Sequence, residues 1–84
     1  MKIFANIINH KINTITPEEL LRYANIFKIS ITNSQAVQIA KYLRGRQVNI
    51  FDDRERATLI KEIARATDIE TAKEVNRLLV ELMK

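Results

Sequence analysis

The sequence predicts an all-α fold, a compact five-helix domain with a minimal two-stranded β bridge between two helix connections. At four places a residue that caps helices is followed three positions later by Glu or Gln, a pattern that marks helix starts. Between these places apolar residues recur at helical intervals of three and four. With one Gly and one Pro as breakers, the helices are expected to be joined by capped turns.

The chain is expected to form one domain over residues 1–84, because this length supports one modest core. Residues 1–13 predict an N-terminal amphipathic helix, and residues 16–84 predict the helical core. Polar Asn6, Asn9 and His10 interrupt the apolar residues of the first segment, so we expect neither a signal peptide nor a membrane span. The absence of Cys excludes a disulfide framework and predicts a cytoplasmic location.

Helix starts after the first are predicted by four pairs: Thr16 with Glu19, Thr32 with Gln35, Asp52 with Glu55, and Thr67 with Glu70. Pro17 strengthens the first pair, because its fixed φ suits the first helical position. At the end of the third predicted helix, Lys41 and Arg44 complement the helix dipole. Gly45 is expected to take the left-handed conformation just beyond this end.

The predicted core follows the apolar stripe of each helix. In the first helix, Ile3, Phe4, Ile7 and Ile8 form this stripe. Phe51, directly before a predicted cap, is expected to pack as a staple onto the following helix. The full predicted core is Ile7, Leu20, Leu21, Ala24, Phe27, Ile29, Val37, Ala40, Leu43, Ile50, Phe51, Leu59, Ile60, Ile63, Val75 and Leu79.

Two segments alternate apolar and polar residues, KISI at 28–31 and QVNIF at 47–51. Such alternation is typical of half-buried strands. We therefore expect residues 29–31 and 48–50 to pair as the β bridge, with their isoleucines pointing inward.

Three runs also carry a family resemblance: LRG at 43–45, VNIFD at 48–52 with an acidic and a basic residue following, and TAKEVN at 71–76. With the surrounding residues 11–80 they resemble the small YqfT-like proteins of bacilli, a family of unknown function. The resemblance implies a cytoplasmic bacterial protein and carries over no catalytic or ligand residue.

Residues for catalysis are scarce, since the chain has no Cys, one His and no glycine-rich loop. We expect no enzyme, no cofactor, no small-molecule substrate and no membrane contact. His10 is expected to be a solvated residue near a helix end, because no second His or Cys completes a metal site. Asp52, Asp53 and Glu55 are expected to cap a helix, because no calcium-loop pattern surrounds them.

Nucleic-acid binding is the alternative function, through a helix-turn-helix-like arrangement around KISITNSQA at 28–36. Residues 1–50 carry seven Lys or Arg against two Glu, a net +5, and residues 51–84 carry seven against eight acids, a net −1. The template puts Lys28 at the turn glycine and Ser34 at an inward position, which argues against it. The predicted contacts, amides for bases and cations for phosphates, are Lys28, Asn33, Gln35, Gln38, Lys41, Arg44 and Arg46.

The favoured function is a non-enzymatic protein-interaction module, with a protein partner or a second copy of the chain bound. Two predicted helices have apolar residues beside their core rows, and we expect so small a chain to leave some of them exposed. The predicted interface is Ile39, Tyr42, Leu78, Val80 and Met83.

Overall fold

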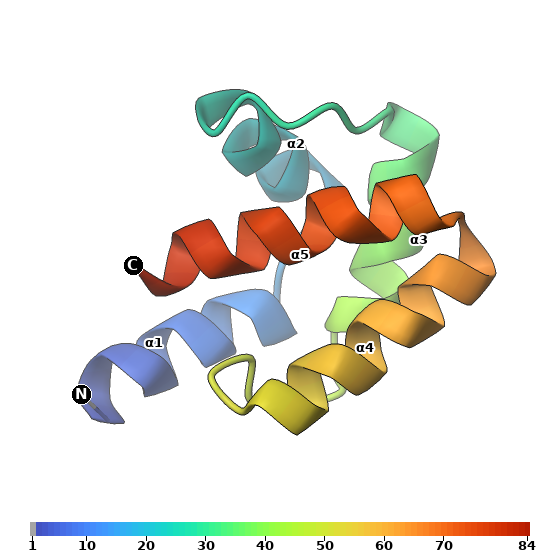
Figure 1. The fold of residues 1–84 in the computed structure, drawn as a ribbon. Helices are drawn as coiled ribbons and strands as arrows, with labels where there is room; N and C mark the ends of the chain where they lie inside the picture. The colour runs from blue at the N-terminus through green and yellow to red at the C-terminus, as the bar shows by residue number, and fades with distance from the viewer. Residues whose placement is uncertain (1) are drawn as a thin grey trace.

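The computed structural model describes the backbone of residues 2–84 and the side chains of residues 5–84. These residues form five helices: α1 (Lys2–Asn13), α2 (Pro17–Ile26), α3 (Asn33–Leu43), α4 (Asp53–Ala66) and α5 (Ile69–Met83), shown in Figure 1. The all-α, five-helix prediction is confirmed. The predicted apolar contributions of Ile3 and Phe4 lie outside the described side chains.

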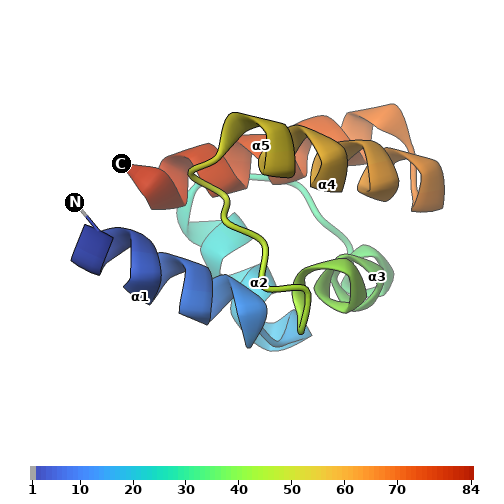
Figure 2. The ribbon, with the colours of Figure 1, turned by 90° about the horizontal axis from the view of Figure 1, so that it is seen from below.

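The helices lie in two layers, seen from below in Figure 2. α4 and α5 form one layer, and α1, α2 and α3 form the other. Only residues 67 and 68 separate α4 from α5, so these helices return on each other as a hairpin. α5 packs against both α4 and α1, and this position gives it a wide buried face.

Three of the four predicted helix starts are confirmed. The Thr16 hydroxyl accepts the Glu19 N–H at 3.1 Å, and the Glu19 carboxylate accepts the Thr16 N–H at 3.1 Å. Thr32 and Gln35 form the same reciprocal capping box at the start of α3. Asp52 caps α4 by accepting two backbone N–H groups. These contacts satisfy N–H groups that a helix start otherwise leaves unpaired.

The fourth predicted start, Thr67, is wrong by one residue. Thr67 is the C-cap of α4, and its hydroxyl donates to the Ile63 carbonyl at 2.6 Å. Asp68 is the N-cap of α5, and its carboxylate accepts the Thr71 N–H at 2.7 Å and the Thr71 hydroxyl at 3.1 Å. Because the carboxylate holds two groups of the first turn, Asp68 takes the cap and Thr67 closes the preceding helix.

Just beyond the ends of α2 and α3, one residue has the left-handed backbone conformation. Gly45 has φ +76° directly after the C-cap of α3, as predicted. At the end of α2 the same conformation is taken by Lys28, with φ +58°. The N–H of Ile29 bonds the Ala24 carbonyl at 2.7 Å and that of Lys28 bonds the Asn25 carbonyl at 3.2 Å, which together form a Schellman motif.

The predicted β bridge is wrong, since residues 2–84 contain no strand and no bridge. Backbone N–H groups of the 47–51 segment bond side chains and not another strand. Gln47 donates to the Asn13 amide oxygen at 2.9 Å, and Ile50 donates to the Asn9 amide oxygen at 3.0 Å. The Asn49 N–H reaches the Glu55 carboxylate at 3.0 Å. These polar side chains satisfy the segment, so no ladder forms.

Most of the predicted core is buried or half-buried, with three corrections. Ile7 is 58% exposed, Val37 is 45% exposed and Phe51 is 36% exposed. Each stands beside a buried neighbour in the sequence, namely Ile8 (half-buried), Ala36 and Ile50. In the two helical pairs, Ile7–Ile8 and Ala36–Val37, neighbouring side chains point about 100° apart, so only one of the two joins the core. Ile50 and Phe51 lie in the turn before α4, where Ile50 points into the core and Phe51 remains partly exposed.

Three predicted core residues, Leu21, Phe27 and Ile60, are half-buried and pack against the core. Other core residues were not predicted. The buried apolar residues absent from the prediction are Ile12, Ile15, Ala36, Ile39, Ala72 and Leu78. Two of these, Ile39 and Leu78, change the interpretation of the surface.

Candidate functional site

The polar residues predicted to contact nucleic acid on α3 do not all remain available. Asn33, Gln38, Lys41 and Arg44 are exposed. Gln35 is engaged, since its oxygen accepts the Thr32 N–H at 2.9 Å and its nitrogen donates to the Thr71 hydroxyl at 2.9 Å. Gln35 therefore joins α3 to α5 and has no free amide for reading a base.

α2 and α3 lack the geometry of a helix-turn-helix. Six residues, 27–32, separate them, whereas the motif has a turn of three or four. Ser34, which the template places inward, is exposed, and the first buried residue of α3 is Ala36. The Schellman motif at Lys28 ends α2, and the chain then continues through further residues before Thr32 caps α3. The connection is therefore longer than the turn of the motif.

Lys28 does not join the other predicted cations. Its carbonyl accepts a hydrogen bond from the Arg77 guanidinium of α5 at 3.3 Å. It also lines a hollow together with Glu70 and Glu74 of α5. Lys28 therefore belongs to a mixed-charge part of the surface beside α5.

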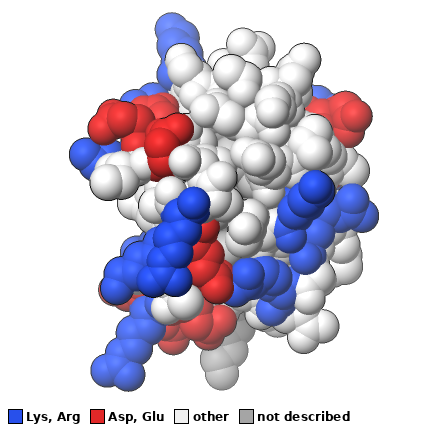
Figure 3. All heavy atoms as spheres, turned by 90° about the vertical axis from the view of Figure 1, so that its right-hand side faces the viewer, with Lys and Arg blue, Asp and Glu red and all other residues white. Residues whose placement is uncertain are grey.

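A basic stripe that the sequence reasoning missed runs along α4. Arg54, Lys61 and Arg65 are exposed at spacings of seven and four residues, which places them on one helix face. α4 packs against α3. Lys41 near the end of α3 and its C-cap residue Arg44 are exposed cations. We name as the basic face the six residues Lys41, Arg44, Arg46, Arg54, Lys61 and Arg65. Figure 3 shows this side of the molecule, with blue basic groups gathered in its lower half and red acidic groups beside some of them.

The charges of the basic face are little compensated. Within the described side chains, Arg46 is paired with Glu62 of α4, and the other five cations form no ion pair. On α5, by contrast, Lys73, Arg77 and Lys84 each pair with an acid three residues earlier. The positive charge of the molecule is thus least neutralised over α3 and α4.

The connection between α3 and α4 is fastened to α1. The Asn13 carbonyl accepts the Gly45 N–H at 3.0 Å, and its side-chain oxygen accepts the Gln47 N–H at 2.9 Å. The Asn9 nitrogen donates to the Asn49 side-chain oxygen at 2.8 Å. Asn9 and Asn13 lie one turn apart on α1, so one face of this helix supplies both contacts to the connection.

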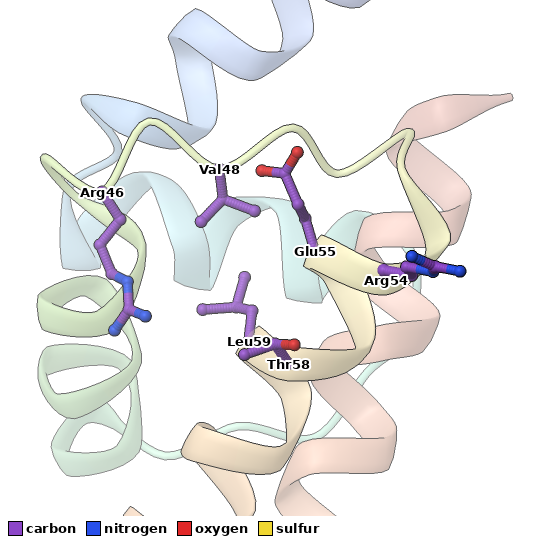
Figure 4. Close-up of a pocket in the computed structure, with 6 residues that line it drawn as sticks. All are labelled: Arg46, Val48, Arg54, Glu55, Thr58 and Leu59. Carbon is purple, nitrogen blue, oxygen red and sulfur yellow. The ribbon is translucent and has the colours of Figure 1, made fainter.

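A shallow hollow of about 280 Å³ lies between this connection and α4. Figure 4 shows Val48 and Leu59 pointing toward each other across it, while Arg54 points away. Arg46, Glu55 and Thr58 also line it. The Glu55 carboxylate accepts the Asn49 N–H, and Arg46 pairs with Glu62. Arg54 forms no ion pair with the described side chains, but it points away from the hollow.

The protein interface predicted from the sequence needs correction. Ile39 and Leu78 are 0% exposed and belong to the core. The prediction failed because α3 and α5 each have packed neighbours on more than one side, so a wide apolar face finds internal contacts. Tyr42, Val80 and Met83 are half-buried.

Two of the half-buried residues lie along the outer junction of α4 and α5. A hollow of about 380 Å³ there is lined by Ala57 and Ile60 of α4 and Asn76 of α5, among others. Val80 follows Asn76 by one helical turn. Arg56, which also lines the hollow, reaches the Met83 sulfur at 3.8 Å. We name as the α4–α5 seam the residues Ala57, Ile60, Asn76, Val80 and Met83.

The acidic residues near the start of α4 have protein partners. Asp52 caps α4, Asp53 accepts a hydrogen bond from Arg56 at 2.8 Å, and Glu55 holds the Asn49 N–H. His10 is exposed. Among the described residues no group of three or more His, Cys, Asp or Glu is arranged to hold a metal ion. None of their helices has the length and apolar character needed to cross a membrane.

An ion pair joins α1 to α2. The Lys11 ammonium donates to the Glu19 carboxylate. This hydrogen bond raises the pKa of Lys11. The same bond, together with the Thr16 N–H, lowers the pKa of Glu19. Glu19 therefore serves both the capping box and the packing of two helices.

Residues 2–84 thus form a small all-α fold of five helices, with a basic face over α3 and α4. The chain belongs to the family described as protein of unknown function (DUF2624), whose match covers residues 1–83. It is 44% identical over 78 residues to the uncharacterized protein YqfT of Bacillus subtilis (strain 168), covering 93% of each chain. No solved structure matches the chain. The resemblance seen in the sequence runs is thereby confirmed.

Proposed function

We propose that this chain is a non-catalytic binding domain that contacts the phosphate backbone of a nucleic acid through the basic face. The observation that carries this proposal is a set of five exposed cations, on α4 and at the end of α3, that form no ion pair among the side chains of residues 5–84. Neutralising phosphates with such groups releases condensed counterions, which drives sequence-independent binding. The proposal keeps the cytoplasmic location expected from the cysteine-free sequence, where nucleic acid is available.

The proposed contacts differ from those the sequence suggested. The 28–46 region contributes Lys41, Arg44 and Arg46, and α4 contributes the rest of the basic face. Lys28 and Gln35 are left out, because the first lies beside α5 and the second joins α3 to α5. With few free amides beside the cations, contacts to phosphates and not to bases are expected to dominate.

Binding to a fluorescently labelled 20-base-pair DNA, measured by anisotropy over a series of salt concentrations, tests the proposal. We expect the affinity to fall steeply with salt, with a slope near −0.9 per phosphate neutralised. The double variant Lys41→Ala/Arg44→Ala is expected to flatten that slope by about two units.

The matched control is Lys73→Ala/Lys84→Ala, which removes the same charge from α5, where both lysines are paired. It is expected to leave the slope nearly unchanged. Absence of DNA binding at low salt would refute the proposal. Equal losses in the two double variants would also refute it, because net charge alone would then explain the binding.

A protein-interaction module, self-associating or with a different partner, is the second candidate, favoured by the α4–α5 seam. It ranks second because Ile39 and Leu78, on which the predicted interface depended, are in the core. Sedimentation equilibrium tests self-association. If the seam is the interface, Met83→Glu makes the protein monomeric while its helical circular dichroism is kept.

The control for the seam is Ile26→Glu, at an exposed position of α2. It is expected to leave the association unchanged. A wild-type protein that is monomeric at every concentration would contradict self-association through the seam.

A further inference from the structure

We infer that the nucleic acid bound by the basic face is double-stranded, an inference that rests on the proposed function and specifies its ligand. The cations form two rows on two helices. Lys41 of α3 and its C-cap residue Arg44 form the α3 row, and Arg54, Lys61 and Arg65 form the α4 row. A single strand presents one row of phosphates, whereas a duplex presents two rows, one on each side of a groove.

The dimensions of the two rows suit a duplex. From Arg54 to Arg65 the α4 row spans eleven residues, about 16 Å along the helix. Packed helices have axes roughly 8–10 Å apart, and the grooves of B-DNA are about 6–12 Å wide. The distance between helix axes is comparable with a groove width, so we expect the long side chains of the two rows to reach the phosphates on both sides of one groove.

The basic face lacks the groups that favour single strands. Proteins that hold single strands stack bases on exposed aromatic side chains. No member of the basic face is aromatic, and the chain has no Trp. Tyr42, the aromatic residue of α3, is half-buried and packs against the core. A single strand would gain only phosphate contacts here, and along one row at a time.

Two residues that the sequence predicted as nucleic-acid contacts already have protein partners. Arg46 pairs with Glu62, and Gln35 is engaged with α5. A bidentate Arg or a free amide is what reads a base edge in the major groove. Because phosphate contacts carry no sequence information and are expected to engage the unpaired cations, we expect duplexes of different sequence to bind with similar affinity.

Three labelled probes at equal phosphate concentration and equal salt test the inference: a 20-base-pair DNA, an unstructured 20-nucleotide strand and inorganic polyphosphate. We expect the duplex to bind about tenfold more tightly than the strand. We also expect polyphosphate to bind more weakly than the duplex. AT-rich and GC-rich duplexes are expected to bind alike.

The outcomes separate the inference from the proposed function. If the single strand binds as tightly as the duplex, the inference is wrong and the proposed function stands. Binding to polyphosphate as tight as to the duplex also refutes the inference, because charge alone would then suffice. If neither nucleic acid binds, both are wrong.

Two double variants test the two-row geometry. Lys41→Ala/Arg44→Ala removes the α3 row, and Arg54→Ala/Arg65→Ala removes two of the three α4 cations. Because all four side chains are exposed, circular dichroism is expected to stay unchanged. We expect either variant to bring the affinities for duplex and single strand close together. A duplex preference that survives in both variants would contradict the two-row arrangement.

Discussion

Asn13, the last residue of α1, holds the backbone on both sides of Arg46. Its carbonyl accepts the N–H of Gly45 at 3.0 Å, and its side-chain oxygen accepts the N–H of Gln47 at 2.9 Å. Gly45 and Gln47 both have positive φ, +76° and +55°. Asn13 thus fixes two left-handed residues, of which Gln47 carries a side chain, on either side of a cation of the basic face.

Asn13→Ala is expected to lower the free energy of unfolding by about 1–2 kcal/mol, because the Gln47 N–H loses its acceptor. Urea denaturation measures this change. Asn13→Asp keeps the side-chain acceptor and is the matched control. A loss as large in the Asp variant would show that the hydrogen bond is not the cause.

Lys28→Gly is expected to raise the free energy of unfolding by about 0.5–1 kcal/mol. Lys28 has φ +58° at the end of α2, a conformation that costs a side-chain-bearing residue more than glycine. Thermal or urea denaturation measures the gain. The same variant should leave the salt slope of DNA binding unchanged, because Lys28 lies beside α5. A flatter salt slope in this variant would show that Lys28 contacts DNA.

Ile50 and Phe51 are adjacent but differ in burial, 0% against 36% exposed. Ile50→Ala is expected to cost about 2–5 kcal/mol of stability, because it leaves a cavity in the core. Phe51→Ala is expected to cost about 1 kcal/mol, because its ring already contacts solvent. Equal losses in urea denaturation would contradict this difference and favour the staple role predicted from the sequence.

The Lys11–Glu19 pair makes stability depend on pH at both ends of the scale. The folded pKa of Glu19 is lowered, so its contribution is present above the ordinary Glu pKa and is lost as pH falls through the lowered value. The folded pKa of Lys11 is raised, so its contribution is present below the ordinary Lys pKa and is lost as pH rises through the raised value.

Glu19→Gln tests the acid end, because Gln retains the capping-box acceptor without the charge. We expect wild type to melt at a higher temperature than the variant at neutral pH and at the same temperature once Glu19 is protonated. A difference in melting temperature that does not change with pH would show that the charge of Glu19 contributes nothing.

The sequence predicts the helix starts well because capping is a local interaction. Thr16, Thr32 and Asp52 act within three residues of themselves, so the pattern contains the whole interaction. At Thr67 and Asp68 two residues suited to capping are adjacent. The choice between them depends on which one also bonds the Thr71 hydroxyl.

The faces of the helices are harder to predict than their starts. In α1, whether Ile7 or Ile8 packs into the core depends on how α1 lies against α5. It also depends on the rotation of α1 that brings Asn9 and Asn13 to the 47–51 segment. In α5 the burial of Leu78 depends on having packed neighbours on two sides, which no local pattern contains. The cations of α4 were missed because counting net charge averages over opposite faces of a helix. Their spacing alone was sufficient to find them.

The bonds from Asn9 and Asn13 to the connection between α3 and α4 span 34 to 41 residues of sequence, whereas the α4–α5 hairpin closes over two. Closing the longer loops costs more chain entropy, so the order of assembly is expected to begin with the hairpin and to end with the docking of α1. In native-state hydrogen exchange, the amides of Gln47 and Ile50 should then exchange through a partial opening that leaves Leu59 and Leu79 protected. Arg46 would lose its fixed position in that opening. The stability of α1 therefore determines how firmly Arg46 is positioned, although the two are more than 30 residues apart in the sequence.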